Sequence, residues 1–257
     1  MTLEQQPLDD TRVEAQHGNG PTTDAPPGSR PRPNVKVTAD LVVLTVRQAQ
    51  LKVLLVERGK HPFVGKLALP GGFLREGEDL ETTAHRELIE ETGLDSADLP
   101  LHQLRTYSSP HRDPRGRVIT TAFLAIAPDL PSPTASTDAR NASWVAVEDT
   151  LMDKLAFDHR TILSDALEEA RRLLEQTTLA TAFCAETFTI SELQQVYEIV
   201  WGMPVDPRNF RRKVRNVTGF VTDTGLKRPS NGRPATLYQR GPAHILHPAM
   251  LRAGNGL

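Results

Sequence analysis

The chain has 257 residues, which suits one large or two modest domains, and its formal net charge of −2 gives no sign of an overall affinity for polyanions. The single cysteine, Cys184, excludes an internal disulfide, and the scarcity of cysteine is typical of proteins from a reducing cytoplasm. The neighbours of Cys184 are apolar, which favours a buried thiol over a nucleophile. The sequence has no apolar run of about 18 residues and no basic, apolar N-terminal leader, so we expect a cytoplasmic protein with no signal peptide and no membrane partner.

Residues 1–34 differ from the rest of the chain in composition. They contain six prolines and three glycines, few large apolar side chains and no hydrophobic periodicity. Such a segment cannot bury enough apolar surface to offset the entropy lost on ordering. We therefore expect a disordered tail over 1–34 and ordered structure from Val35 onward.

Short β-branched and apolar runs follow the tail. Residues 37–46 and 51–56, joined by a short polar link, predict a hairpin. Arg58 then opens a loop, and a short strand over 67–69 leads into the pair Gly71-Gly72. Adjacent glycines allow the backbone to approach a metal ion or phosphate closely, although a plain turn is the alternative. Further strands are expected over 101–108, 118–127 and 143–147.

The stretch from Leu80 to Thr92 has the spacing of an amphipathic helix. Apolar residues recur every four positions, acidic residues cluster at its start, and Gly93 follows its end. Three carboxylates at i, i+3 and i+4 share one face of this helix: Glu87, Glu90 and Glu91. Like charges so placed cost about 0.2–0.5 kcal/mol per pair, a cost that a hard divalent cation reverses. The alternative is an acidic, solvated face.

The residues around this helix also match a family motif. The matching positions are Gly72, Glu78, Arg86, Glu87, Leu88, Glu90, Glu91, Gly93 and Leu94. The chain therefore resembles a Nudix protein. The resemblance implies an α/β/α sandwich that binds Mg²⁺ or Mn²⁺ and a nucleoside diphosphate joined to another group. It implies these roles: Glu87, Glu90 and Glu91 as metal ligands or catalytic base, Arg86 as the residue that orients a glutamate, and the Gly72 carbonyl as a further metal ligand.

A basic loop lies between two of the expected strands, at 110–117. It contains three arginines, whose planar guanidinium groups suit phosphates: Arg112, Arg115 and Arg117. We expect these three, together with Arg58, to bind the ligand, and the alternative is a solvated hairpin loop. A long helix follows over 160–176. Asp158 and His159 at its start are expected to cap and pack the helix rather than to contact ligand.

After Gln176 the pattern is that of a second domain. The expected elements are a short helix over 178–185, a brief strand at 188–190, a helix over 192–201 with Ser191 as N-cap, a helix over 207–217 with Asp206 as N-cap, and a hairpin that returns over 235–239. This order is that of a winged helix-turn-helix.

Positive charge is concentrated in this C-terminal part. From Asp206 to Arg240 there are nine basic and two acidic residues, a balance of +7 that leaves −9 on the remainder of the chain. Such a patch predicts binding of double-stranded DNA through phosphate neutralisation, with the second helix in the major groove and the hairpin on the backbone or minor groove. For any one residue the alternative is a solvated surface charge. The candidate DNA contacts are Arg208, Asn209, Arg211, Arg212, Lys213 and Arg215 on the helix, and Lys227, Arg228 and Arg233 on the hairpin.

Residues 35–240 as a whole resemble Nudix-related transcriptional regulators, in which a Nudix domain is fused to a C-terminal winged helix. The similar segments are Pro70–Phe73, Arg112–Arg117, Phe157–His159, Asn209–Arg212 and Gly232–Tyr238. The expected domains are the tail over 1–34, the Nudix domain over 35–176, the winged helix over 177–241 and a C-terminal tail over 242–257.

The resemblance implies two alternative functions. In the first, the protein is a homodimeric repressor of NAD-biosynthesis or related operons that binds a palindromic operator and senses ADP-ribose or a related nucleotide. A sugar derivative as effector remains an alternative. In the second, the protein is an active Mg²⁺-dependent ADP-ribose pyrophosphatase with an accessory DNA-binding domain.

Overall fold

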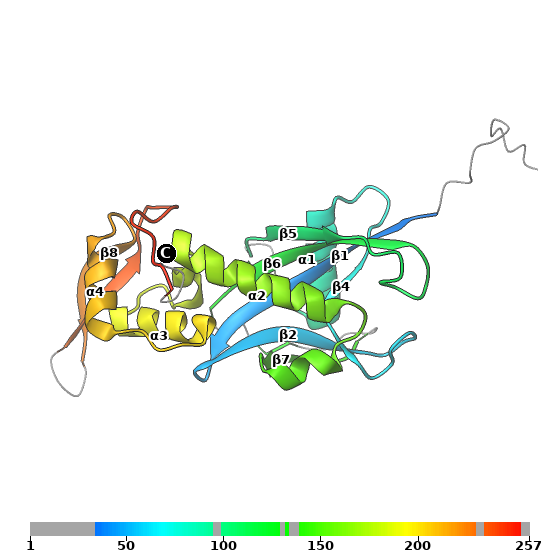
Figure 1. Ribbon diagram of the computed structural model, residues 1–257, viewed down its shortest axis with the longest axis horizontal. Coiled ribbons are helices and arrows are strands. Elements are labelled where there is room, and N and C mark those ends of the chain that lie inside the picture. The colour runs from blue at the N-terminus through cyan, green and yellow to red at the C-terminus, as the bar shows by residue number, and fades with distance from the viewer. Residues whose placement is uncertain (1–33, 95–98, 129–131, 134–138, 230–233, 253–257) are drawn as a thin grey trace, which may run out of the picture. The chain divides into compact units, whose positions relative to one another are not determined.

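The computed structural model describes residues 34–94, 99–128, 132–133, 139–229 and 234–252 (Figure 1). The tail expected over 1–34 therefore lies, apart from Asn34, outside the described residues.

A mixed sheet forms the centre of the N-terminal part. Its strands are β1 (Lys36–Arg47), β2 (Gln50–Arg58), β3 (Leu67–Ala68), β4 (Gly71–Phe73), β5 (His102–Tyr107), β6 (Val118–Ile126) and β7 (Ala139–Ala146). The order is β3-β2-β1-β6-β5, with β4 paired to β1 and β7 paired to β2. In this order β1 lies in the middle of the sheet. The pair β1–β6 is parallel, and the other strand pairs are antiparallel.

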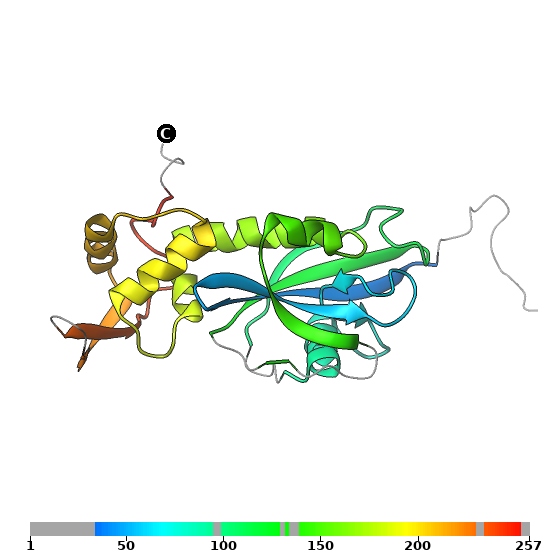
Figure 2. The same ribbon diagram turned by 90° about the horizontal axis from the view of Figure 1, so that it is seen from below.

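Helices cover both faces of this sheet (Figure 2). Val42 and Leu44 of β1 belong to a core cluster with α2 (His159–Gln176), whereas Leu41 and Val43 belong to a second cluster with α1 (Leu80–Thr92). A strand buried on both faces reads as a continuous apolar run, which explains the composition of β1 and β6. The expected α/β/α sandwich is thus confirmed, and α1 has the bounds that its sequence predicts.

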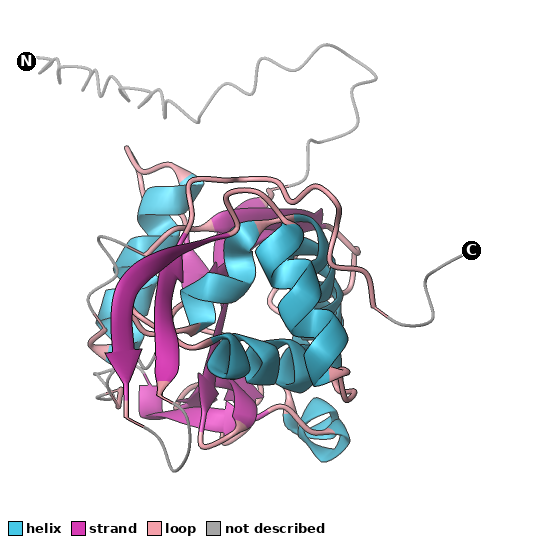
Figure 3. Cartoon of the chain, turned by 90° about the vertical axis from the view of Figure 1, so that its left-hand side faces the viewer, coloured by secondary structure: helices cyan, strands magenta, loops and turns pink. Residues whose placement is uncertain are grey.

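The C-terminal part is a winged helix (Figure 3). After the 3₁₀ helices η1 (Asp149–Lys154) and η2 (Thr178–Phe183), its elements are α3 (Ile190–Trp201), α4 (Pro207–Asn216), β8 (Val221–Arg228) and β9 (Ala235–Arg240). The predicted N-cap of α4 is confirmed, since the Asp206 side chain accepts a hydrogen bond from the Asn209 amide.

The predicted N-cap of α3 was wrong. The cap is Thr189, two residues before Ser191, and it forms a capping box with Glu192. The Thr189 hydroxyl accepts from the Glu192 amide at 3.1 Å, and the Glu192 carboxylate accepts from the Thr189 amide at 2.7 Å. Such reciprocal bonding satisfies two amides that the first helical turn leaves free. The strand expected at 188–190 is reduced to a single bridge between Phe188 and Tyr238.

The C-terminal segment is more than a tail. Residues 242–252 run back to the end of α2, where the amides of Leu246 and Met250 donate to the carbonyls of Gln176 and Glu175, each at 2.8 Å. Leu246 and Met250 are both 1% exposed. The burial of these two side chains explains why the segment packs against α2. The segment is short and has no hydrophobic periodicity, so its sequence alone does not predict this packing.

One hydrophobic core runs through both parts of the chain. The cluster that contains Val42 of the sheet continues along α2 to Tyr197 in α3 and Phe210 in α4. The Tyr197 hydroxyl donates to the Leu174 carbonyl at 2.9 Å, and Arg171 Nε donates to the Val200 carbonyl at 2.9 Å. The last turns of α2 are therefore part of the core of the winged helix (Figure 1).

Candidate functional site

The caps of α1 fix the direction of its carboxylates. Asp79 accepts from the Thr82 amide at 2.8 Å, and Gly93 ends the helix in the left-handed conformation with φ 65°. Ala84 and Leu88 are buried against the sheet. This packing leaves the face with Glu87, Glu90 and Glu91 free to line a cavity.

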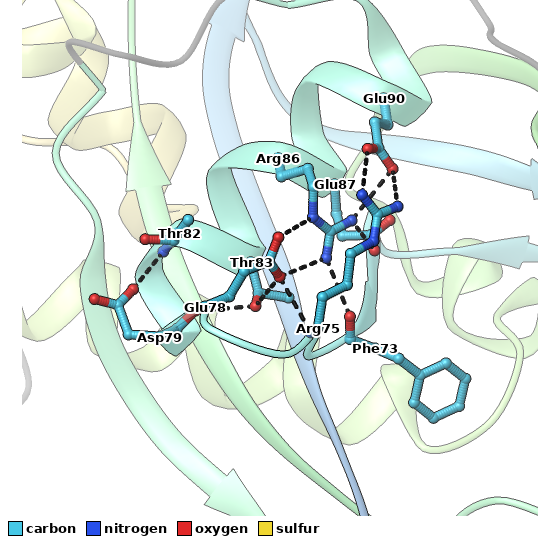
Figure 4. Close-up of polar contacts among 9 residues, drawn as sticks. All are labelled: Phe73, Arg75, Glu78, Asp79, Thr82, Thr83, Arg86, Glu87 and Glu90. Carbon is cyan, nitrogen blue, oxygen red and sulfur yellow. Dashed lines mark hydrogen bonds and ion pairs between the residues drawn. The ribbon is translucent and has the colours of Figure 1, made fainter.

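Arg86 ties the helix to the preceding loop (Figure 4). Its Nε donates to Glu78 Oε1 at 2.6 Å, its Nη2 to the Phe73 carbonyl at 3.1 Å, and its Nη1 to Glu87 Oε1 at 2.6 Å. The hydrogen bonds from Arg86 hold the pKa of Glu78 down, at about 2. Arg86 thus contacts two glutamates, Glu78 and Glu87, and its role in orienting one of them stays a prediction.

Glu87 lies against the backbone of Gly72. A Cβ added at Gly72 would come within 2.1 Å of Glu87 Oε1, so any side chain at that position would displace the carboxylate. Gly71 has no room for a side chain either, because its Cβ would lie 2.4 Å from the Ala39 carbonyl oxygen. The glycine pair therefore permits close approach of backbone to a carboxylate rather than a plain turn.

Glu91 is a partly buried acid. Burial raises its pKa to about 8, and the charges of Glu87 and Asp40 act in the same direction, against a hydrogen bond from the Gly71 amide. That amide donates to Glu91 Oε2 at 3.0 Å. A partly buried carboxylate with like-charged neighbours is the arrangement that a bound cation stabilises.

Glu90 is more exposed than the other two carboxylates and is bound by arginines. Arg75 Nη1 and Nη2 donate to its two oxygens at 3.1 and 3.0 Å, and Arg86 Nη1 lies 3.2 Å from Oε2 (Figure 4). In the part of the chain that the structure describes, no three His, Cys, Asp or Glu side chains are gathered closely enough to hold a metal ion.

These residues nevertheless suit a hard cation. Carboxylate and carbonyl oxygens are what Mg²⁺ and Mn²⁺ prefer, and Glu87 lies close to the backbone of Gly72. Glu87, Glu91 and the Gly72 carbonyl could hold the ion, and release of Glu90 from Arg75 would add a further ligand. A bound divalent ion would polarise a phosphate oxygen and make a bound water more acidic.

The cavity that these carboxylates line has a volume of about 620 Å³. Its walls come from β1, β2, β4 and α1, from the loop at 108–117 and from the start of α2. The volume lies within the range of small-molecule and cofactor sites. The walls carry both signs of charge, with carboxylates on α1 and guanidinium groups from β2 and the loop.

The four expected ligand-binding arginines are placed differently. Arg58 and Arg115 line the cavity, whereas Arg117 does not, and its Nη1 instead donates to the Ser108 carbonyl at 2.6 Å. Arg112 also lines the cavity but is 8% exposed, and it forms ion pairs with Asp158 and Asp40. Burial acts to lower the pKa of Arg112, but its hydrogen bonds to Asp158 and the charge of Asp40 outweigh that effect and raise it.

Several cavity residues were not candidates in the sequence analysis, among them Asp40, Phe157 and His159. Asp40 is a buried carboxylate on β1, and a charged residue within an apolar strand could have revealed it. Phe157 lines the cavity but gives no clear sequence pattern. His159 was expected only to cap and pack; it is 4% exposed, its Nδ1 accepts from the Leu69 amide at 2.9 Å, and its ring also reaches the cavity. Burial lowers its pKa.

The second site is the exposed face of α4. Phe210 and Val214 are buried, and the basic residues surround this apolar seam. The side chains on the exposed face are Arg208, Asn209, Arg211, Arg212 and Arg215, with Lys213 half-buried. Arg212 Nη2 donates to Asn209 Oδ1 at 2.7 Å, so these two residues form one polar unit.

The hairpin has a smaller set of exposed cations. Lys227 and Arg228 are exposed on β8, and Arg228 Nη1 lies 2.6 Å from Glu192 Oε1 on α3. This exposed ion pair links the hairpin to α3 and reduces the positive charge that Arg228 presents to a partner. Arg233 lies outside the described residues. No helix in the described part of the chain is long and apolar enough to span a membrane.

A Nudix fold with its signature side chains around a cavity, followed by a basic winged helix, defines a two-domain Nudix protein. Residues 36–166 match the NUDIX domain, and residues 180–239 match the NrtR DNA-binding winged helix domain. The chain therefore belongs to the Nudix family, among the members that carry an NrtR winged helix. Nudix proteins generally use divalent metal ions.

Individual relatives cover one or both parts of the chain. A protein of Acinetobacter baylyi described as an ADPR responsive transcriptional repressor, NtrR, is 34% identical over 80% of this chain and 82% of its own length. Shewanella oneidensis NrtR complexed with a 27mer DNA is 36% identical and superposes with a TM-score of 0.68 over 80% of this chain and 94% of that one. The ADP-ribose pyrophosphatase of Methanocaldococcus jannaschii is 44% identical over 44% of this chain and 64% of its own length.

Proposed function

We propose that the protein is a transcriptional repressor that binds double-stranded DNA through its winged helix and senses ADP-ribose or a related nucleotide in the Nudix cavity. The observation that carries the proposal is the shared helix α2. Phe157, just before it, lines the cavity, and Asp158 at its start is bound by the cavity residue Arg112. The last turns of α2 pack in the core of the winged helix. Binding of a ligand in the cavity can therefore affect the winged helix through α2.

The proposal extends to the partners and the setting. The ligand-binding metal is Mg²⁺ or Mn²⁺, held by the Glu87 and Glu91 carboxylates and the Gly72 carbonyl. The protein acts as a homodimer on a palindromic operator, because two-fold symmetry in the protein selects two-fold symmetry in the site. It works in the cytoplasm, where bacterial operators are found, and its targets are operons of NAD biosynthesis or related metabolism.

Double-stranded DNA binding can be tested before the operator sequence is identified. Duplexes enriched from a random pool by the full chain would be titrated in fluorescence anisotropy at several salt concentrations, with and without ADP-ribose and Mg²⁺. We expect a steep loss of affinity with salt, a palindrome in the enriched sequences and a changed Kd with ADP-ribose. Failure to enrich any duplex would overturn the repressor function.

The contact residues are tested in the same assay. Arg211→Ala on the exposed face of α4 should lower the slope of log K against log salt by about 1. Arg105→Ala is the matched control, since Arg105 is an exposed arginine of β5 that pairs with Asp165. An equal effect of both variants would show that the loss reflects overall charge rather than a contact of α4 with phosphate.

A second candidate function is hydrolysis of the ligand. It is favoured by the intact arrangement of Glu78, Arg86, Glu87 and Glu91 around the cavity. In this reaction water attacks a pyrophosphate phosphorus and the bridging P–O bond breaks, which yields AMP and ribose 5-phosphate from ADP-ribose. Release of AMP with Mg²⁺ or Mn²⁺ that is abolished in Glu87→Gln would support this activity, whereas no release would limit the cavity to sensing.

A further inference from the structure

Cations and aromatic rings alternate in a series that starts at Lys36, which does not line the cavity, and continues along one cavity wall. The ring of Phe73 has Lys36 Nζ at 5.6 Å from its centroid and the guanidinium carbon of Arg115 at 5.0 Å. The ring of Phe157 has the same Arg115 carbon at 5.3 Å and the Arg58 carbon at 4.7 Å. The order is Lys36, Phe73, Arg115, Phe157, Arg58, which we call the cation–ring series.

The series is assembled from distant parts of the chain. Phe73 ends β4, Arg58 ends β2, Arg115 lies in the loop before β6, and Phe157 directly precedes the N-cap of α2. Phe157 adopts a left-handed backbone with φ 52°, a conformation unfavourable for a residue with a Cβ. Its ring is further held by the edge of Phe63, with 4.9 Å between centroids and 74° between planes. Backbone strain of this kind is commonly found at functional sites.

The two arginines of the series are more available to a ligand than Arg112. Arg112 is neutralised by Asp158 and Asp40, so it has little positive charge to offer a ligand. Arg58 forms no ion pair with any described residue, and its Nε donates to the Pro62 carbonyl at 2.8 Å. Arg115 is paired with Asp113 through Nε and Nη2, but its side chain is 36% exposed, against 4% for that of Arg112. An aromatic face attracts a guanidinium group without taking up its N–H donors, which stay available to an anion.

We propose that Phe73 and Phe157 are positioning residues of a diphosphate subsite, in which the guanidinium groups of Arg58 and Arg115 bind the two phosphates. The subsite rests on the proposed function, because it takes the ligand to be a nucleoside diphosphate derivative. The carboxylates of α1 lie in the same cavity, so a diphosphate held by the arginines could also meet a metal ion held by Glu87 and Glu91.

The rings improve binding through preorganisation. A free arginine side chain loses rotational freedom when it binds a phosphate, and that loss weakens the complex. A ring that already fixes the plane of the guanidinium group removes most of this loss. The subsite should therefore discriminate by the number of phosphates: strongest for a diphosphate, weaker for a monophosphate and absent for a nucleoside.

The experiment changes the charge on the ring face while keeping its shape. Phe157 would be replaced in the full chain by phenylalanines with one, two and three ring fluorines, each of which weakens cation–π attraction. Calorimetry would give the Kd of ADP-ribose, inorganic pyrophosphate and adenosine. We expect the Kd of ADP-ribose and pyrophosphate to rise stepwise, by about 2- to 30-fold across the series, without effect on adenosine. Phe157→Tyr, which keeps an electron-rich ring, should restore binding.

A structural role would give a different pattern. The matched control places the same fluorinated phenylalanines at Phe123, a buried ring of β6 that does not line the cavity, and they should leave the Kd of pyrophosphate unchanged. Equal affinities across the fluorine series would overturn the subsite while leaving the sensing function intact. If the wild type bound pyrophosphate with the stepwise trend but not ADP-ribose, the subsite would stand and the proposed effector would fall. Binding of neither ligand by the wild type would overturn both.

Discussion

Arg112 holds Asp158 by two parallel hydrogen bonds, 2.8 Å from Nε to Oδ2 and 2.7 Å from Nη2 to Oδ1. Asp158 occupies the N-cap position of α2, yet its side chain makes no capping bond to the helix. The arginine has taken the carboxylate that would otherwise cap α2. This pair therefore joins the basic loop of the cavity to a helix of 18 residues, about 27 Å long, whose far end lies in the winged helix.

The first prediction is that this pair is needed for stability. Asp158→Asn leaves the guanidinium group of Arg112 buried without its main partner, and loss of one member of a buried pair costs about 3–5 kcal/mol. The cost here should fall at the low end, since Asp40 lies 3.5 Å from Arg112 and keeps part of the compensation. Urea denaturation monitored by circular dichroism would measure the free energy of unfolding.

The control for this variant lies close by on the same helix. Arg160 pairs with Asp153, and both side chains are largely exposed, so Arg160→Ala should change the free energy of unfolding by less than about 0.5 kcal/mol. A similar loss for the two variants would mean that Asp158 acts as a general helix-start charge rather than through Arg112.

Much of this architecture was predictable because its determinants are local. Helix α1 is set by its caps and its apolar spacing, so its bounds could be read from the sequence. The same holds for α4, where Asp206 and Pro207 mark the start. The signature motif also indicated that Glu87 and Glu91 belong to one site, since one helical turn brings them together.

The remainder depends on contacts between distant segments. Whether Arg112 or Arg117 reaches the cavity is decided by how the loop packs on α2, and the two look alike in sequence. Thr189 and Ser191 are both good caps, and the bridge between Phe188 and Tyr238 decides where the extended segment ends. Residues 242–252 are likewise held in place by contacts with α2, and these contacts cannot be read from the sequence of the segment itself.

The second prediction concerns pH. Burial lowers the pKa of His159, whose Nδ1 must stay unprotonated to accept from the Leu69 amide. The unfolded state then binds a proton below about pH 6.5 that the folded state does not, so stability falls as the pH drops from that value toward the folded pKa. The groups that face His159 are Asp40 and Asp158, which oppose this shift, and Arg112 and Arg58, which reinforce it.

His159→Asn tests this dependence, because the Asn side-chain oxygen can accept from the Leu69 amide but does not titrate. Urea midpoints of wild type and variant would be compared from pH 5 to 7.5. The wild type should lose stability relative to the variant as the pH falls below about 6.5. A constant difference between the two proteins over this range would contradict the assignment.

The third prediction separates stability from metal binding. Glu91→Gln removes a partly buried carboxylate whose ionisation is opposed by burial and by Glu87 and Asp40, and the new amide oxygen can still accept from the Gly71 amide. The metal-free variant should be more stable than the wild type by about 1–3 kcal/mol at pH 8. It should also lose the rise in Tm that Mn²⁺ gives the wild type, because a metal ion stabilises only the fold that binds it.

Thermal unfolding with Mn²⁺ and with a chelator measures both effects. The control is Glu76→Gln, which changes an exposed glutamate of the same acidic stretch that does not line the cavity. This variant should keep both the metal-free Tm and the response to Mn²⁺. A Glu91→Gln protein that is destabilised and still responds to Mn²⁺ would rule out Glu91 as a metal ligand.

The fourth prediction compares two neighbouring residues of the C-terminal segment. Met250 is 1% exposed in the core that α2 shares with the winged helix, whereas Leu251 is 49% exposed. Met250→Ala should lower the free energy of unfolding by about 2–4 kcal/mol through lost burial and a residual cavity, and Leu251→Ala by less than about 0.5 kcal/mol. Urea denaturation of the full chain would measure both values.

Since the segment joins α2 to the winged helix, Met250→Ala should also weaken the effect of ADP-ribose on DNA affinity. Equal, small losses in the two variants would show that residues 242–252 form a dispensable tail.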